Sequence, residues 1–227
     1  MAEEKKSEPE PAIPGPAEVQ VPPAVVSRLS LYLRELQHLV RDGHETTSST
    51  QLGKLLGFTD AQVRKDLAYF GQFGYPGIGY RCPELIAAIK KILGTNQSWS
   101  LAIVGMGNLG RALIGYRGFH QQGFEIVAGF DTDPAKIGSH VEGIEVFHLD
   151  DIGRIVREKN IRMAIVAVPS SVAQRVADAL VSAGIEGILN FAPVTLALPK
   201  HIRTVGVDLA IELEQLSFNV VSKVPKE

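Results

Sequence analysis

A short apolar run leads directly into a glycine-rich turn near the middle of this 227-residue chain. Leu101 to Val104 is continuously apolar, which is typical of a strand covered on both faces, and Gly105-Met106-Gly107-Asn108-Leu109-Gly110 follows at once. In a G-x-G-x-x-G turn the first glycine allows the tight bend and the third lets a helix lie close on the strand. The pattern therefore predicts a strand, this turn and a helix, which is the first unit of a doubly wound sheet.

The rest of the C-terminal half repeats this alternation. Further strand candidates are Ile126 to Phe130, Gly143 to Phe147, Met163 to Val168, Ile188 to Phe191 and Arg203 to Val207, with helical segments at Leu109 to Arg117 and Ser171 to Ala183. Alternating strands and helices predict a parallel sheet with helices on both faces. We assign residues 98–207 to an α/β, Rossmann-like domain.

An acidic residue ends the second predicted strand. Asp131 follows Gly110 by 21 residues, the distance at which a carboxylate meets the adenosine ribose of a dinucleotide. The free N–H groups of the helix that starts in the glycine turn would hold the pyrophosphate. Because a carboxylate repels a 2′-phosphate, the sequence predicts NAD(H) rather than NADP(H). A glycine turn without a ligand is the alternative.

Other candidate contacts to the dinucleotide lie after later strands, where doubly wound sheets bind ligands. These are Lys136, Val168-Pro169-Ser170 and Asn190-Phe191-Ala192-Pro193. Ordinary strand-to-helix turns and a solvated surface lysine are the alternatives for these positions.

Residues 22–94 have a different, helical period and carry nine basic and six acidic side chains. Val26, Leu29, Leu33, Leu36 and Val40 mark the first helix. A second helix starts at Ser49, a Thr59–Gln62 capping box opens a third, and Pro83 starts a fourth that runs to Leu93. The glycine- and aromatic-rich residues 71–80 predict a turn or flared hairpin. Three helices followed by such a hairpin predict a winged helix-turn-helix.

The third helix of this block is the candidate for entering a DNA major groove. The predicted DNA contacts are Gln62, Arg64, Lys65 and Tyr69 on that helix, together with Ser49. A solvated helix face is the alternative, because most charge clusters are only that.

The two ends and the composition add further expectations. Residues 1–21 are rich in Pro and Glu, so we expect a disordered tail, and their start lacks the apolar segment of a secretory signal. A lone cysteine, Cys82, fits the reducing cytoplasm, and no apolar run approaches the length of a membrane span. No spacing suggests a metal site. Residues 208–227 contain an amphipathic helix that needs a surface to pack on.

Many motifs of this chain, in the same order along the sequence, resemble those of one protein family. They are SSTQLGKLLGF, TDAQVRKDLAYFGQFG, VGMGNLG, FDTDPAKIG, GILNFAPV and VDLAIELEQLSF, spread from residue 22 to about 220. They look like the Rex family of redox-sensing transcriptional repressors. The resemblance implies a homodimer that binds an inverted-repeat operator in double-stranded DNA when NADH is scarce and is released by NADH, with NAD+ competing for the same pocket.

The resemblance also implies roles for particular residues. Arg28, Tyr116 and Asp208 match family positions that couple the nicotinamide redox state to domain closure. The last helix, which Asp208 opens, is exchanged between subunits in the family. One departure is the wing, where Tyr75-Pro76 stands in place of the usual Lys or Arg, so the resemblance does not imply a wing contact to DNA in this chain.

Two other functions remain open on the residues alone. An NAD-dependent dehydrogenase would need a substrate domain, yet 37 residues follow Asn190 and much of that stretch is one helix. A nucleotide- or CoA-binding module of a larger enzyme would not need the basic helical block. The expectation is therefore a regulator and not an enzyme.

Overall fold

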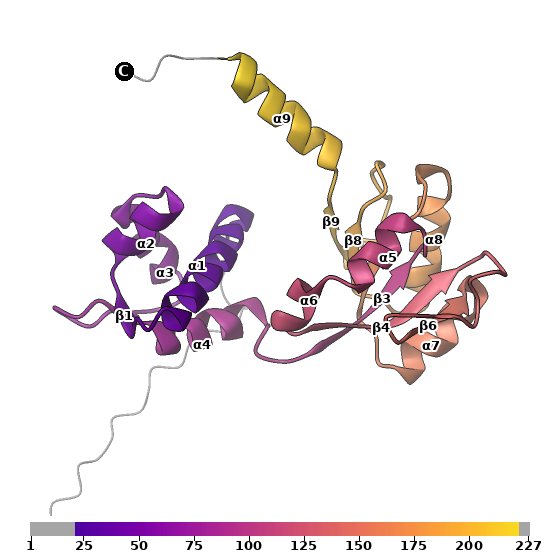
Figure 1. Ribbon diagram of the computed structural model, residues 1–227, viewed down its shortest axis with the longest axis horizontal. Helices are drawn as coiled ribbons and strands as arrows, with labels where there is room; N and C mark the ends of the chain where they lie inside the picture. The colour runs from indigo at the N-terminus through magenta and orange to yellow at the C-terminus, as the bar shows by residue number, and fades with distance from the viewer. Residues whose placement is uncertain (1–20, 223–227) are drawn as a thin grey trace, which may run out of the picture. The chain divides into compact units, whose positions relative to one another are not determined.

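The computed structural model describes residues 21–222, which form two compact units divided after Gln97 (Figure 1). The tail predicted over residues 1–21 lies outside the described part of the chain, except for its last residue, Val21. No helix among residues 21–222 is long and apolar enough to cross a membrane.

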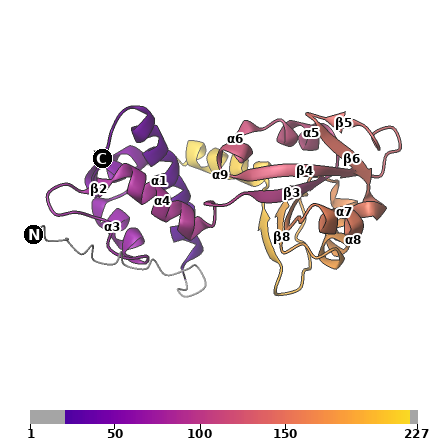
Figure 2. The ribbon, with the colours of Figure 1, turned by 90° about the horizontal axis from the view of Figure 1, so that it is seen from below.

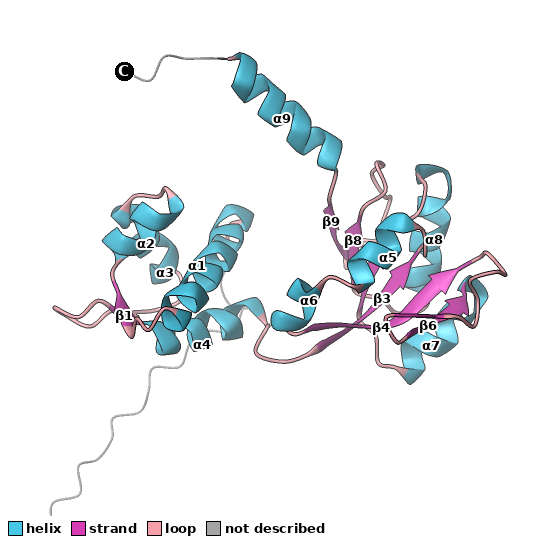
Figure 3. Ribbon diagram, viewed as in Figure 1, coloured by secondary structure: helices cyan, strands magenta, loops and turns pink. Residues whose placement is uncertain are grey.

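The N-terminal unit consists of four helices and a two-stranded antiparallel sheet (Figure 3). The helices are α1 (Pro23–Arg41), α2 (Ser49–Leu56), α3 (Asp60–Ala68) and α4 (Cys82–Leu93), and the strands are β1 (Thr46–Thr47) and β2 (Tyr80–Arg81). Leu29, Leu33 and Leu36 of α1 are buried in the core of this unit, as their period predicts. The prediction is wrong at the two ends of the series, because Val26 and Val40 are exposed and Val25 and Leu39 are the buried residues there. Cys82 is buried in this core.

Local signals set the helix ends closely, with two differences from the sequence prediction. The N-cap of α2 is Ser48, which accepts a hydrogen bond from the Gln51 N–H, so Ser49 is the first helical residue. Thr59 caps α3 by accepting from the Gln62 N–H, but the Gln62 side chain does not complete the capping box. Its amide instead donates to Asp66, because that carboxylate lies one turn further along the same face.

The glycine-rich segment between α3 and α4 is a tight hairpin, as predicted. The Tyr75 N–H donates to the Gly79 carbonyl at 2.7 Å, and the two residues form an isolated antiparallel bridge. Gly79 has a φ of 87°, and a Cβ there would clash with the Thr47 backbone, so this position requires glycine.

The C-terminal unit is a seven-stranded sheet with helices on both faces. Its strands are β3 (Trp99–Val104), β4 (Phe124–Asp131), β5 (His140–Val141), β6 (Ile144–His148), β7 (Met163–Val166), β8 (Gly187–Asn190) and β9 (Arg203–Gly206). The order is β5-β6-β4-β3-β7-β8-β9, and every pair is parallel except β5 with β6. Without β5 this is the strand order of a Rossmann fold, as predicted.

Side chains of β3 alternate between two cores. Leu101 and Ile103 face α5 (Asn108–Ile114) and α6 (Arg117–Gln121), whereas Ala102 and Val104 face α7 (Ile152–Glu158) and α8 (Ser170–Ser182). Figure 2 shows these two helix pairs on opposite sides of the sheet. A short 3₁₀ turn, Leu149–Asp151, leads into α7.

Three predicted segments have different bounds in the structure. The helix expected over residues 109–117 is broken at Gly115-Tyr116 into α5 and α6. β7 ends at Val166, so Ala167 and Val168 belong to the loop that follows. The last helix, α9 (Leu209–Val221), has no buried residue, and its apolar side chains are exposed on all sides.

Candidate functional site

The glycine turn lies where β3 ends and α5 begins, and two of its glycines cannot be replaced without moving backbone. Gly105 has a φ of 99°, and a Cβ there would clash with the Ala167 carbonyl. A Cβ on Gly110 would meet the Gly105 carbonyl oxygen inside contact distance. Gly107, the N-cap of α5, has open space at its Cβ position and an ordinary φ of −78°. Folding therefore does not require glycine at position 107. A closely bound phosphate would require it, because the backbone can approach the phosphate only where there is no side chain.

The other three residues of the turn differ in exposure. Asn108 and Leu109 are exposed in the first turn of α5, near the free N–H groups of the helix. The Met106 side chain is buried in the core beneath the sheet, so this residue offers only its backbone to a ligand.

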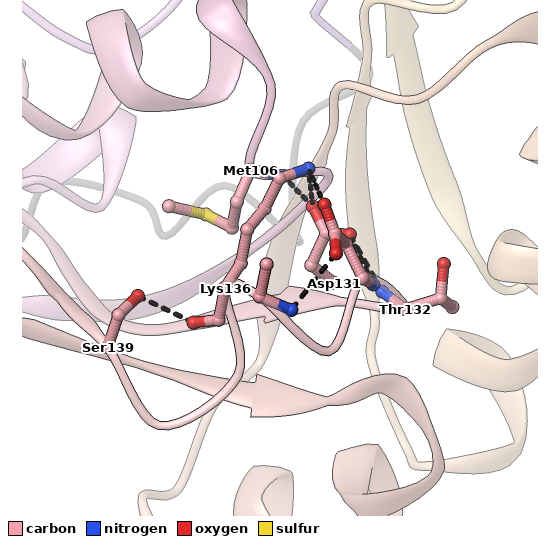
Figure 4. A network of polar contacts seen from close by, with 7 residues as sticks. Met106, Asp131, Thr132, Lys136 and Ser139 are labelled. Atoms are coloured by element: carbon pink, nitrogen blue, oxygen red, sulfur yellow. Dashed lines mark hydrogen bonds and ion pairs between the residues drawn. The ribbon is translucent and has the colours of Figure 1, made fainter.

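Asp131 connects the end of β4 to the glycine turn (Figure 4). Its Oδ2 accepts hydrogen bonds from the Met106 N–H at 2.8 Å and the Lys136 ammonium at 3.0 Å. Its Oδ1 accepts from the N–H groups of Thr132 at 2.8 Å and Asp133 at 2.9 Å. Sequence reasoning placed Asp131 beside the turn but did not predict the Lys136 ion pair.

These contacts keep the Asp131 carboxyl ionised. Partial burial pushes its pKa upward, but the Asp133 N–H, the Lys136 ammonium and the Met106 N–H outweigh burial and hold the pKa below its usual value. The same ion pair raises the pKa of Lys136. A fixed negative charge thus lies at the position that would face a ribose.

The loop after β7 adjoins the glycine turn, because the Gly105 Cβ position meets Ala167 and Val168. Pro169 and Ser170 are exposed at the start of α8. The structure thus brings the turn, Asp131, Lys136 and this loop to the carboxyl edge of the sheet.

The loop after β8 lines a separate cavity of about 460 Å³, which also contains the start of α9. Asn190, Ala192, Pro193, Val207 and Asp208 are among its lining residues. The Asn190 amide is buried and bonds the loop to itself, donating to the carbonyls of Ala192 and Val194 and accepting from the Ala192 N–H. Asn190 therefore shapes this loop. Phe191 is half-buried and packs against the β3 core.

Tyr116 does not share the cavity that contains Asp208. It is 59% exposed and lines a second cleft, of about 530 Å³, with Phe119, Glu142 and Ile144. Its ring packs edge-on against Phe119 at 5.0 Å between centroids. Asp208 caps α9 by accepting from the Ala210 N–H. One chain by itself therefore does not bring these two predicted coupling residues into one cavity.

The predicted DNA-binding residues on α3 differ in how free they are. The Arg64 guanidinium is bound to Asp60 at 2.7 Å and to the Ser49 hydroxyl at 3.2 Å, and it lowers the pKa of Asp60. Lys65 is exposed. Tyr69 is the C-cap of α3 and, like Gln62, is partly buried, and its side chain packs against the core of the N-terminal unit.

Arg28 and Asp66 form an ion pair that the sequence analysis missed. The Arg28 Nε and Nη2 donate to the two carboxylate oxygens at 2.6 and 2.8 Å, and the Tyr32 hydroxyl adds a hydrogen bond of 2.8 Å. The Asp66 side chain is 1% exposed. A signal was available, since Asp66 occupies an apolar-face position of α3 between Val63 and Phe70.

These groups set each other's charge state. Burial pushes the pKa of Asp66 upward, but the hydrogen bonds from Arg28, Tyr32 and Gln62 outweigh it and hold the pKa below its usual value. Burial and the bond to Asp66 raise the pKa of Tyr32, and the Asp66 carboxylate raises that of Arg28.

The wing is held by polar contacts at its base. The Tyr75 hydroxyl donates to Glu84 at 3.0 Å, the Arg81 guanidinium lies 4.9 Å from the centroid of the Tyr75 ring, and Arg81 pairs with Glu84 at 3.1 Å. Tyr75 therefore offers Arg81 an aromatic face, which a Lys or Arg at this position would not provide.

Comparison with known proteins covers both units. A family model described as a putative DNA-binding protein N-terminus matches residues 20–68, and one described as a CoA binding domain matches residues 96–194. A redox-sensing transcriptional repressor Rex from Carboxydothermus hydrogenoformans is 49% identical over 88% of this chain and 97% of its own length. This chain belongs to the Rex family. The Rex of Desulforamulus reducens is 47% identical over 90% of this chain and 98% of its own length.

Solved structures agree with this assignment. RSP is a Rex-family repressor. Its crystal structure in complex with NAD+ and operator DNA has a TM-score of 0.85 and 34% identity, covering 89% of this chain and 94% of that one. RSP in complex with NADH gives a TM-score of 0.81 over similar coverage. Because Rex proteins are transcriptional repressors, the prediction of a regulator instead of an enzyme is confirmed. Residues 21–222 contain no cluster of three or more His, Cys, Asp or Glu side chains that could hold a metal.

Proposed function

We propose that this chain is a transcriptional repressor that binds operator DNA when NADH is low and releases it when NADH binds. The observation that carries the proposal is the ionised Asp131 beside a glycine turn with open space at Gly107, in one chain with a winged helix-turn-helix. Its Rex relatives are named redox-sensing repressors, and RSP has been crystallised with NAD+ and operator DNA and with NADH. NAD(H) is a regulatory ligand here and not a reactant.

The remaining parts of the proposal concern organisation. Residues 22–94 form the DNA-binding domain, 98–207 the NAD(H)-binding domain and 208–227 the dimerisation segment of a cytoplasmic homodimer. Exposed Leu213, Leu216 and Phe218 of α9 support the exchange of this helix between subunits, since apolar patches of this kind mark interaction surfaces. Sedimentation of the wild-type chain and of a Leu213→Glu/Leu216→Glu variant tests the dimer.

The cofactor assignment predicts that Asp131→Ala weakens NADH binding by about ten- to hundredfold, since a hydrogen bond to a charged group contributes about 1.5–3 kcal/mol. The preference for NADH over NADPH should narrow as well, because the negative charge that repels a 2′-phosphate is lost. Titration calorimetry with both dinucleotides measures the effect. Equal affinities of the wild-type protein for NADH and NADPH would refute the assignment.

The DNA assignment predicts that Arg64→Ala lowers operator affinity by about 1–3 kcal/mol if the guanidinium meets a base edge. Arg64 must first leave Asp60 and Ser49, so Asp60→Ala should raise the affinity. NADH affinity should not change in either variant. Fluorescence anisotropy measures DNA binding, with Lys200→Ala in the other unit as the charge-matched control. An unchanged affinity in Arg64→Ala would mean that α3 is not the recognition helix.

Coupling is tested by measuring operator affinity with and without saturating NADH. A ligand shifts two states only through its different affinity for them, and the effect is reciprocal. We expect a coupling of about 1–3 kcal/mol in the wild type and less in Tyr116→Phe and Asp208→Ala. Release of DNA by the same factor in wild type and in both variants would mean that these residues do not couple the sites.

Helix α1 carries two arginines that could couple the two sites, Arg28 and Arg34. Arg28 is engaged by the buried Asp66, whereas Arg34 on the same helix is exposed. An arginine that changes partners between two states costs less to move when it starts in solvent. We therefore include Arg34→Ala beside Arg28→Ala in the double titration, and expect Arg34→Ala to leave folding unchanged.

A further inference from the structure

The Asp66 carboxylate fixes the amide of Gln62 at the first turn of α3. Gln62 Nε2 donates to Asp66 Oδ1 at 2.7 Å, while Arg28 and Tyr32 hold the same carboxylate from α1. An ionised carboxylate only accepts hydrogen bonds, so the amide nitrogen must face it. A flipped amide would put two oxygens together. The orientation of Gln62 is therefore determined by charge.

In this orientation the Gln62 amide has one hydrogen-bond donor and one acceptor that Asp66 does not use. One N–H of Gln62 is used by Asp66, and the second N–H and Oε1 make no hydrogen bond to residues 21–222. The side chain is partly exposed, and the backbone N–H of Gln62 is bonded to the Thr59 cap. Gln62 thus presents one acceptor and one donor from a fixed position.

Resting on the proposed DNA-binding function, we propose that Gln62 reads an adenine in the major groove and that Asp66 is the positioning residue that holds its amide. Adenine offers a donor at N6 and an acceptor at N7, which a glutamine amide matches with both of its groups. Guanine offers two acceptors, so Oε1 would face O6 and be repelled. The first residues of a recognition helix are those that reach base edges.

The two basic side chains next to Gln62 on α3 are less suited to reading a base. Arg64 is held by Asp60 and Ser49, and Lys65 is a flexible cation, which suits a phosphate more than a base edge. The fixed amide is therefore the group on this helix turn that is prepared for reading a base before DNA arrives. Fixing it in the free protein lowers the entropy lost on binding.

The test uses the full-length protein and a randomised duplex library to select its preferred operator. Each base pair of one half-site is then changed in turn, and the affinity is measured for wild type, Gln62→Met and Lys65→Ala. We expect the wild type to prefer A·T over G·C at one position by about 5- to 150-fold, the range of a bidentate contact. Gln62→Met should lose this preference at that pair alone, whereas Lys65→Ala should weaken all duplexes evenly. Replacing that adenine with 7-deazaadenine, which lacks the N7 acceptor, should weaken wild type and leave Gln62→Met unchanged.

The positioning role of Asp66 is tested separately. Asp66→Asn keeps the shape but removes the charge that orients the amide, so we expect a reduced preference at the Gln62 base pair and no change at the others. A merely structural role would lower affinity at every pair equally. If Asp66→Asn does not fold, NMR of the wild-type Gln62 amide decides, because one of its two protons should be protected from exchange.

The outcomes separate this inference from the function it rests on. A wild-type protein that selects no duplex overturns both. An operator that is selected, with every preference kept in Gln62→Met, overturns the inference and leaves the proposed function standing. A Gln62 amide whose two protons exchange equally fast overturns the role of Asp66.

Discussion

Gly107→Ala should fold with the thermal stability of the wild type and yet lose at least about tenfold in NADH affinity. Gly107 has an ordinary φ, and no atom lies within 4 Å of its Cβ position, so alanine fits the protein. The added methyl group would occupy the space through which a pyrophosphate approaches the N–H groups of α5. Each charged hydrogen bond lost there is worth about 1.5–3 kcal/mol. Titration calorimetry and a thermal melt on the same sample measure both effects.

Gly110→Ala is the matched control, since it is the same chemical change three residues later. Its Cβ would collide with the Gly105 carbonyl, so the turn must move and both stability and NADH affinity should fall. The pair of variants separates a glycine kept for a ligand from one kept for packing. If Gly107→Ala bound NADH as tightly as the wild type does, the proposed pyrophosphate site at the glycine turn would be wrong.

Arg28→Ala should destabilise the N-terminal unit by about 3–5 kcal/mol, the cost of leaving a buried carboxylate without its charged partner. Asp66 is 1% exposed in its side chain, and two of its four hydrogen bonds come from Arg28. Urea unfolding followed by circular dichroism measures the change, and fluorescence of Trp99 monitors the other unit. An unfolding midpoint equal to that of Arg34→Ala, an exposed arginine on the same helix, would contradict the prediction.

The same pair makes stability depend on pH. The pKa of Asp66 is lower in the folded protein than in the unfolded chain, where the pKa of Asp is about 3.9. Its contribution is therefore complete above that unfolded value and is lost as the pH falls through the folded pKa. The difference in unfolding free energy between wild type and Asp66→Asn should accordingly shrink between about pH 5 and the lower, folded pKa.

This ion pair also bears on the redox switch. If Arg28 couples the two units, it must leave or share a buried carboxylate that also orients Gln62 on α3. A change at Arg28 would then reach the face of α3 that we propose to read DNA. Loss of DNA binding in Arg28→Ala therefore needs the stability measurement beside it, because unfolding and uncoupling would look alike in a gel shift.

The sequence determined the elements that local chemistry controls. The glycine turn, the strand before it and the acid that ends β4 could be placed because each depends on residues within one βα unit. The helix ends at Gly57 and Thr59 follow from a left-handed glycine and a hydroxyl cap, which are equally local. Short, continuously apolar runs between helical segments predicted the parallel sheet, because a strand that is buried on both faces is apolar along its whole length.

Tertiary structure decided which partners the charged side chains chose. Arg28 and Asp66 are 38 residues apart, and only the packing of α1 on α3 brings them together, so Arg28 looked like a free coupling residue in the sequence. Tyr116 and Asp208 line different cavities of one chain, and the family resemblance predicts that Asp208 acts from the partner subunit. Periodicity records which side chains are buried, but a buried charge is stable only beside a partner that the fold supplies, and that partner is not encoded locally.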